Sequence, residues 1–160
     1  MYKNEDGCIS FCYDSDQLFN DVSLLSAYMA KSLSVGENSV VDEYSISSDE
    51  REIYNECVNQ ALPSICEELI KLTSFVSNAF ESNLLLEFKI NDNSAYNENI
   101  LGLVDSTLLN CIKYSVLSEY YSICTNPTLY GLARQKFDTN LFQLKQRLFQ
   151  LKKKSVSPQY

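Results

Sequence analysis

The sequence contains no histidine and no tryptophan, and it has only four glycines and three prolines among 160 residues. Without histidine, the chain has no imidazole that could serve as a general base, a metal ligand or a pH switch. The scattered glycines form neither G-x-x-x-x-G-K-[ST] nor G-x-G-x-x-G, the loops that cradle phosphate groups. These absences exclude histidine-dependent catalysis and the familiar nucleotide-binding loops.

Carboxylate pairs are present, but their spacing does not suit catalysis. Asp49–Glu50 and Glu67–Glu68 are sequence neighbours, which point to different sides of a helix and so indicate a solvated face. A two-metal carboxylate site needs acidic residues on inward faces, and the inward stripes of this chain are apolar. Glu119, near the edge of one stripe, is the exception and is interpreted as an edge residue. We therefore expect no enzyme activity, no cofactor and no metal.

The six cysteines do not form a metal-binding pattern. No C-x-x-C pair occurs, and Cys57 and Cys66 would lie about 180° apart on a continuous helix. The polar, acidic N-terminus does not resemble a secretory signal, and no apolar run approaches the ~18 residues of a membrane span. We expect a cytosolic protein that does not bind membranes, with reduced and mostly structural thiols.

Charge is divided unevenly along the chain, whose net charge is −8. Residues 1–126 contain 6 basic and 20 acidic residues, a net charge of −14, whereas residues 127–160 contain 7 basic and 1 acidic residue, a net charge of +6. This asymmetry indicates either an electrostatic contact with another copy or protein, or a solvated basic helix end favoured by the helix dipole. The acidic body repels phosphate, so we expect no sequence-specific binding of nucleic acid.

Apolar residues at helical spacing predict three or four helices. The stripes cover residues 18–33, 54–79, 108–123 and 130–151. Ser15 or Asp16 is a candidate cap of the first helix. A capping box of Ser47 and Glu50 marks the start of the second helix. Pro63 interrupts the second stripe without changing its phase, which favours one kinked helix over two.

The later part of the chain combines a strand with two further helices. Residues 84–90 alternate between apolar and polar positions and predict a strand. Because only one clear strand is visible, we expect it to pair with a strand of another copy or partner, unless a second strand lies at Val40–Val41. Asp105 is a candidate cap of the third helix, and Asn126–Pro127 is a typical start for the last one.

The last helix has two apolar stripes. Its main stripe lies within about ±40° of Phe137, and Phe142 and Phe149 project about 130° away from it. One stripe suffices for packing onto a small bundle, so we expect the second stripe to contact another subunit or a partner. The alternative is that both stripes are buried in one core.

The apolar stripe stops at Leu151, and a short basic tail follows it. Pro158 disfavours helix at the residue before it, and Tyr160 is an aromatic residue with a polar tip that suits an interface pocket. We expect the tail to be an extended arm that docks on an acidic surface of another protein; the alternative is a frayed end. The candidate partner-binding residues are Phe142, Phe149, Lys152, Lys153, Lys154, Pro158 and Tyr160.

The order of these parts resembles the small helical head-to-tail connector proteins of tailed bacteriophages, also called adaptor or head-completion proteins. Ring proteins of crAss-like gut phages are a close comparison. The resemblance is one of architecture over residues 15–160. It is carried by the segments "SSDEREIYNECVNQALPSICEELIKLTSFV", "NLLLEFKIND", "SEYYSICTNPTLYG" and "LKQRLFQLKKKSVSPQY".

The resemblance implies a structural virion protein that is assembled in the host cytoplasm. Its partners would be the portal and tail proteins, and about twelve copies would form a ring between them. The alternative is a cytosolic helical adaptor or regulatory protein that binds a partner protein. The predicted fold class is mainly α, a three- to four-helix bundle with a small β insert. The predicted organisation is an N-terminal arm (1–14), a helical connector domain (15–151) and a basic C-terminal tail (152–160).

Overall fold

The computed structural model describes residues 2–3, 8–33, 41–73, 75–89 and 98–152. Its helices are α1 (Ser15–Lys31), α2 (Val41–Tyr44), α3 (Arg51–Ile70), α4 (Leu101–Ile123) and α5 (Pro127–Lys152), with short 3₁₀ turns at Ser48–Glu50 and Glu98–Ile100. The strands are β1 (Tyr2–Lys3), β2 (Cys8–Asp14), β3 (Phe75–Phe80) and β4 (Asn83–Lys89). This arrangement confirms the predicted class, a mainly α fold with a small β element.

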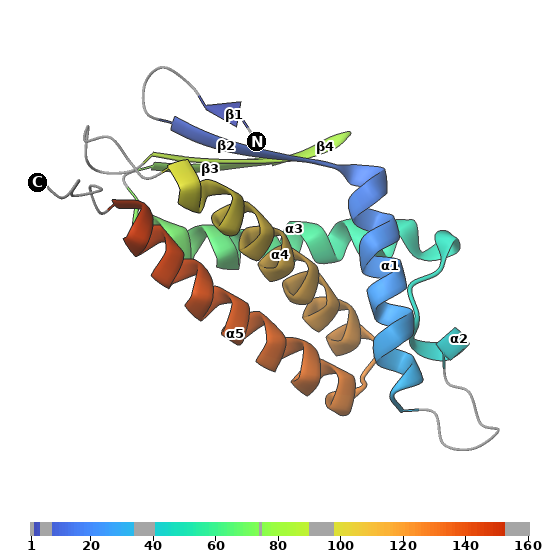
Figure 1. The fold of residues 1–160 in the computed structure, drawn as a ribbon. Helices are drawn as coiled ribbons and strands as arrows, with labels where there is room; N and C mark the ends of the chain where they lie inside the picture. The colour runs from blue at the N-terminus through green and yellow to red at the C-terminus, as the bar shows by residue number, and fades with distance from the viewer. Residues whose placement is uncertain (1, 4–7, 34–40, 74, 90–97, 153–160) are drawn as a thin grey trace, which may run out of the picture.

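The strands form one antiparallel sheet in the order β1-β2-β4-β3, which lies along one side of the helices (Figure 1). The predicted strand at 84–90 is confirmed as β4 over Asn83–Lys89, and Ile90 lies outside the described residues. The expected pairing of this strand with another chain is wrong, because β2 and β3 occupy its two sides. The alternative, a second strand at Val40–Val41 that pairs with β4, is also wrong. Val41 begins α2, and Val40 lies outside the described residues.

The first residues were expected to form an arm, but residues 8–14 belong to the folded domain as β2. Ile9 and Phe11 are buried in the core, and β2 pairs with β4 from Cys8 to Asp14. Ser10, between Ile9 and Phe11, is also buried and donates to the Glu87 carboxylate at 2.7 Å, whereas Cys12 is exposed. Asp14 caps α1, because its Oδ1 accepts from the backbone N–H of Gln17 at 2.8 Å. The candidate caps Ser15 and Asp16 are therefore inside the helix.

The second long helix begins as predicted and ends earlier. The backbone N–H of Ser47 donates to the Glu50 carboxylate at 2.9 Å, and α3 continues through Pro63. It ends at Ile70, where the Thr73 hydroxyl donates to the Leu69 carbonyl at 2.7 Å. The predicted helix over residues 71–79 is wrong, because Phe75–Phe80 is β3 and hydrogen-bonds to β4.

The core lies between the sheet and the helices, and α4 is its central helix. Helix α4 contacts α3 on one side and α5 on the other (Figure 1). It begins at Leu101, before the predicted cap Asp105, whose carboxylate accepts from the Tyr13 hydroxyl at 2.8 Å. Helix α5 begins as predicted at Pro127, and Asn126 Oδ1 accepts from the Leu129 N–H at 3.0 Å.

Helix α3 is covered on two sides, which explains the position of its cysteines. Cys57 and Cys66 point in opposite directions, yet both are buried. The α3 helix packs against both α4 and β3, and Asn78 of β3 donates to Cys66 Sγ at 3.2 Å. Burial raises the pKa of the Cys57 thiol to about 12. These thiols are held as neutral core groups.

Candidate protein-interaction surface

Helix α5 has one buried side and one exposed side. The side facing α4 places six residues in the core: Leu129, Ala133, Phe137, Leu144, Leu148 and Leu151. On the opposite side, Phe142 and Phe149 are 63% and 61% exposed. The two rings lie outside the core, so the alternative that both stripes are buried together is overturned. Tyr130, which the sequence placed in the main stripe, is also exposed.

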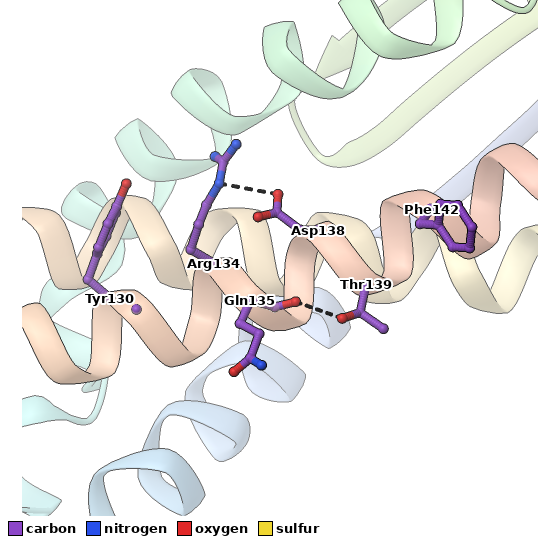
Figure 2. Close-up of a pocket in the computed structure, with 7 residues that line it drawn as sticks. Tyr130, Arg134, Gln135, Asp138, Thr139 and Phe142 are labelled. Atoms are coloured by element: carbon purple, nitrogen blue, oxygen red, sulfur yellow. Dashed lines mark hydrogen bonds and ion pairs between the residues drawn. The ribbon is translucent and has the colours of Figure 1, made fainter.

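A shallow groove runs along the outer side of α5 (Figure 2). It is lined by Tyr130, Gly131, Arg134, Gln135, Asp138, Thr139 and Phe142. Arg134 Nε forms an ion pair with Asp138 at 3.4 Å, and the Thr139 hydroxyl donates to the Gln135 carbonyl at 2.8 Å. Figure 2 shows the rings of Tyr130 and Phe142 at the two ends of this row. We call the exposed residues Tyr130, Arg134, Asp138, Phe142 and Phe149 the α5 face.

The chemistry of the α5 face favours contact over catalysis. Its two charged groups pair with each other one helical turn apart, an exposed interaction that contributes about 0.3–0.5 kcal/mol. Its remaining residues are the aromatic Tyr130, Phe142 and Phe149, and the groove adds the amide of Gln135 and the hydroxyl of Thr139. Large exposed aromatic side chains in a row are typical of protein interfaces.

A basic cluster lies beside the C-terminal half of the α5 face. Lys145, three residues after Phe142 and four before Phe149, forms an ion pair with Glu68 of α3. Lys71 contacts the other oxygen of the same carboxylate at 2.5 Å. Hydrogen bonds from Lys145 and then Lys71 lower the pKa of Glu68 below its ordinary value. Two ammonium groups share the Glu68 carboxylate, and Glu67 lies close enough to Lys71 to interact with its charge.

A second basic residue of α5 is turned towards α4. The Arg147 guanidinium donates to the Leu103 carbonyl at 2.7 Å and contacts the Thr107 hydroxyl. Arg147 thus fixes α5 against the first turns of α4, and its positive charge has no carboxylate partner among the described residues.

Two surface features escaped the sequence reasoning. The turn between α4 and α5 lines a small pocket, with Thr125 in the left-handed backbone region at φ 54°. Helices α1 and α4 line another groove, next to which Leu24 and Tyr28 are exposed. The Thr-Asn-Pro sequence signalled the turn. Leu24 and Tyr28 are not part of the apolar stripe predicted for the first helix. That position outside the stripe was the only sequence signal that they would be exposed.

The predicted tail contributes little to the described surface. Lys152 is the last residue of α5. Lys153, Lys154, Pro158 and Tyr160 lie outside the described residues. Glu119, singled out by the sequence, is partly exposed on α4. Within the described ranges, no group of three potential metal ligands could hold an ion, and no helix is long and apolar enough to cross a membrane.

Comparison with known proteins identifies no relative: no family model, no curated protein and no solved structure matches this chain.

Proposed function

We propose that this protein is a structural virion subunit, a head-to-tail connector that is assembled in the host cytoplasm and forms a ring between portal and tail. One observation carries the proposal: Phe142 and Phe149 are more than half exposed on a helix whose other side supplies the core. Two aromatic rings exposed to water do not stabilise the folded monomer. Burying each ring fully in an interface would contribute about 1.5–3 kcal/mol.

The form and chemistry of the chain support an assembly role. Helix α5 has 26 residues, about 39 Å of continuous surface on the outside of the bundle. Its outer side offers aromatic rings rather than a constellation of catalytic groups. The tail, Lys152–Tyr160, is proposed to add a second contact, with the portal or an adjacent copy.

The proposal is tested with the double variant Phe142→Ser, Phe149→Ser. We expect wild-type protein to form rings in electron micrographs, alone or on a portal, and the variant to stay monomeric in sedimentation experiments. Both rings lie outside the core, so the variant should keep the circular dichroism spectrum and the folding stability of the wild type. The variant Leu24→Ser, Tyr28→Ser, which loses exposed apolar area on α1 instead, is the matched control and should assemble normally. Ring formation by the Phe142, Phe149 variant would refute the assigned role of the α5 face.

The alternative function is a cytosolic adaptor that binds one partner helix. The groove between Tyr130 and Phe142 favours it, because twelve residues of one helix offer a surface of about 18 Å to an antiparallel helix. This function predicts a protein that stays monomeric and forms complexes of fixed one-to-one composition. Mass measurement of the purified protein alone and with a portal separates the two functions.

A further inference from the structure

We infer that two copies of the free protein pair through their α5 faces, antiparallel to each other and about a two-fold axis. In this pairing Phe142 of each copy enters the groove on the other copy's α5, which we call the α5 groove. Phe149 enters the pocket at the turn between α4 and α5, which we call the turn pocket. The turn pocket is lined by Tyr121, Ser122, Thr125, Asn126, Pro127 and Tyr130. The inference goes beyond the proposed function, because it concerns the protein before it joins a ring.

The α5 groove has the form of a socket for a side chain. Figure 2 shows Arg134 and Asp138 along one side of it and Gln135 and Thr139 along the other. Gly131 also lines the groove, and nothing lies within 4 Å of the position that a Cβ would take there. Residues 131, 134, 135 and 138 have the spacing of a hole that accepts one side chain from a facing helix. The groove is therefore suited to a ring from a second helix.

The spacing of the two rings matches the spacing of the two hollows. Phe142 and Phe149 are seven residues apart, about 10.5 Å along the helix. The α5 groove is centred near residue 135, and the part of the turn pocket that Asn126, Pro127 and Tyr130 line is centred near residue 128. These centres are also seven residues apart. In an antiparallel pair both rings therefore reach their hollows at once, and the two-fold axis passes between residues 138 and 139.

The pairing brings no net charge together. The charged residues of the α5 face, Arg134 and Asp138, pair with each other at 3.4 Å, so each face is neutral. Both lie within about one and a half turns of the axis, where two guanidinium groups and two carboxylates gather and opposite signs meet. Lys145 is held by Glu68 of its own chain. The Lys145 residues of the two copies are about 20 Å apart along the helices, because the pair is antiparallel.

The aromatic rings supply enough area for a stable pair. Phe142, Phe149 and Tyr130 are 63%, 61% and 41% exposed. At about 200 Å² for a whole aromatic side chain, these residues expose about 330 Å² in each copy. The surfaces that they cover lose a similar area, so the contact buries roughly 1,300 Å² in total, which is within the range of specific interfaces.

Two other arrangements leave the hollows unfilled. In a parallel pair each ring meets the same ring of the other copy, and both hollows stay empty. Leu24 and Tyr28 of α1 are also exposed, but they are four residues apart, about 6 Å along the helix. They cannot fill two hollows that are about 10.5 Å apart. The spacing therefore selects a second α5 as the occupant.

A single cysteine near the axis tests the arrangement. In a protein whose exposed Cys12 is changed to Ser, Thr139→Cys should be joined to the same residue of a second copy by a short bismaleimide. Gln146→Cys in the same background is the matched control, because Gln146 is also exposed on α5. Its two copies are about 23 Å apart along the antiparallel helices, so it should give no covalent dimer above the level of Cys12→Ser alone. Dimers from both variants would mean a parallel pair, and dimers from neither would mean no pair; each result refutes the inference.

Charge reversal tests whether the charged groups of the two copies meet. Arg134→Asp places four carboxylates near the axis and should weaken dimerisation about tenfold or more. Arg134→Asp together with Asp138→Arg restores a neutral face and should return the dissociation constant to within about threefold of the wild type. Sedimentation velocity over a concentration series measures the dissociation constants, and circular dichroism checks that the variants are folded. A double variant that associates as weakly as Arg134→Asp would refute this geometry.

The outcomes distinguish the pairing from the proposed function. A two-fold contact is closed, so a ring that uses the α5 face has to replace the pairing. Wild-type protein that stays monomeric over the whole concentration series refutes the pairing and leaves the ring on a portal possible. Wild-type dimers that never form a ring on a portal refute the proposed function and leave the pairing intact. Free protein that forms rings without a dimer refutes the pairing alone.

Discussion

Thr125 joins α4 to α5 in a backbone conformation that its side chain disfavours. Its φ is 54°, where a β-branched residue is strained by about 1–2 kcal/mol. The Thr125 N–H donates to the Ser122 carbonyl at 3.2 Å, and the Asn126 N–H donates to the Tyr121 carbonyl at 3.1 Å. This is the Schellman ending of a helix, in which glycine is the usual residue at that position.

We expect Thr125→Gly to raise the free energy of unfolding by about 1 kcal/mol, because glycine adopts this φ without steric cost. Urea denaturation followed by far-UV circular dichroism measures the change, since the chain has no tryptophan. Ser122→Gly, an exposed position in the last turn of α4, is the control. It should lower the free energy of unfolding by about 0.5 kcal/mol. Destabilisation by both substitutions would contradict the strain argument.

Two buried tyrosines differ in whether their hydroxyl groups are satisfied. The Tyr54 hydroxyl is buried and has no hydrogen-bond partner among the described residues. The Tyr121 hydroxyl donates to the Ser26 carbonyl at 3.2 Å. Burial raises the pKa of both phenols, so both are neutral at physiological pH.

Tyr54→Phe should therefore raise the free energy of unfolding by about 1 kcal/mol, because it removes an unsatisfied buried donor. Tyr121→Phe should lower it by about 1 kcal/mol, because it removes a donor that has its partner. The same urea titration measures both variants. Changes of opposite sign in the free energy of unfolding would show that only the Tyr121 hydroxyl is satisfied. Equal changes in the two variants would mean that the Tyr54 hydroxyl has a partner in solution.

At the scale of elements, the packing of β2 determines whether residues 8–14 belong to the folded domain. Phe11 is fully buried and stacks on Phe88 of β4, with ring centroids 5.6 Å apart. We expect Phe11→Ala to lower the free energy of unfolding by about 3–5 kcal/mol. Cys12→Ala changes the next residue, which faces water, and should alter it by less than about 0.5 kcal/mol. Small effects from both substitutions would restore the interpretation of this segment as an arm.

The elements that the sequence predicted correctly are those with local signals. Asn126–Pro127 starts α5, the capping box at Ser47 opens the 3₁₀ turn that leads into α3, and strict alternation marks β4. Each signal acts within a few residues of the structure that it determines. Long apolar stripes added enough information to identify the helices and the fold class.

The sequence did not predict β1, β2 or β3, and the pairing of β2 and β3 with β4 explains two of these omissions. In β2 the apolar residues Ile9 and Phe11 alternate with Cys8, Ser10 and Cys12, so the segment has the composition of a polar arm although Ser10 is buried. In β3, Val76 and Ala79 continue the helical spacing of α3 by coincidence. Pairing with β4 decides both cases, and such tertiary contacts override local preference.

The candidate surface was partly predictable, because helical geometry is also a local signal. Helical geometry alone placed Phe142 and Phe149 away from the buried stripe of α5, and the structure leaves them exposed.

At the scale of the whole molecule, two electrostatic effects oppose each other during assembly. Each copy has a net charge of −8, so copies repel each other as whole bodies. A chain of this length has a radius of gyration of about 15 Å, which corresponds to a sphere of about 20 Å radius, so the centres of touching copies are about 40 Å apart. That distance is about four Debye lengths at 0.1 M salt, so the repulsion is largely screened. Charges that meet at a contact are screened much less.

Salt therefore shows which effect dominates association. If opposite charges meet at the contact, raising NaCl from 50 to 500 mM should weaken self-association by about tenfold or more. Two or three exposed ion pairs of up to ~1 kcal/mol each suffice for such a change. Association that strengthens with salt would mean that net repulsion dominates and that the contact is apolar. Sedimentation equilibrium at each salt concentration measures the dissociation constant.

Removing residues 155–160 and changing Lys152, Lys153 and Lys154 to Gln should reduce this salt dependence, because the basic tail adds charge to the contact. A salt response identical to that of the intact chain would mean that the tail takes no part in assembly.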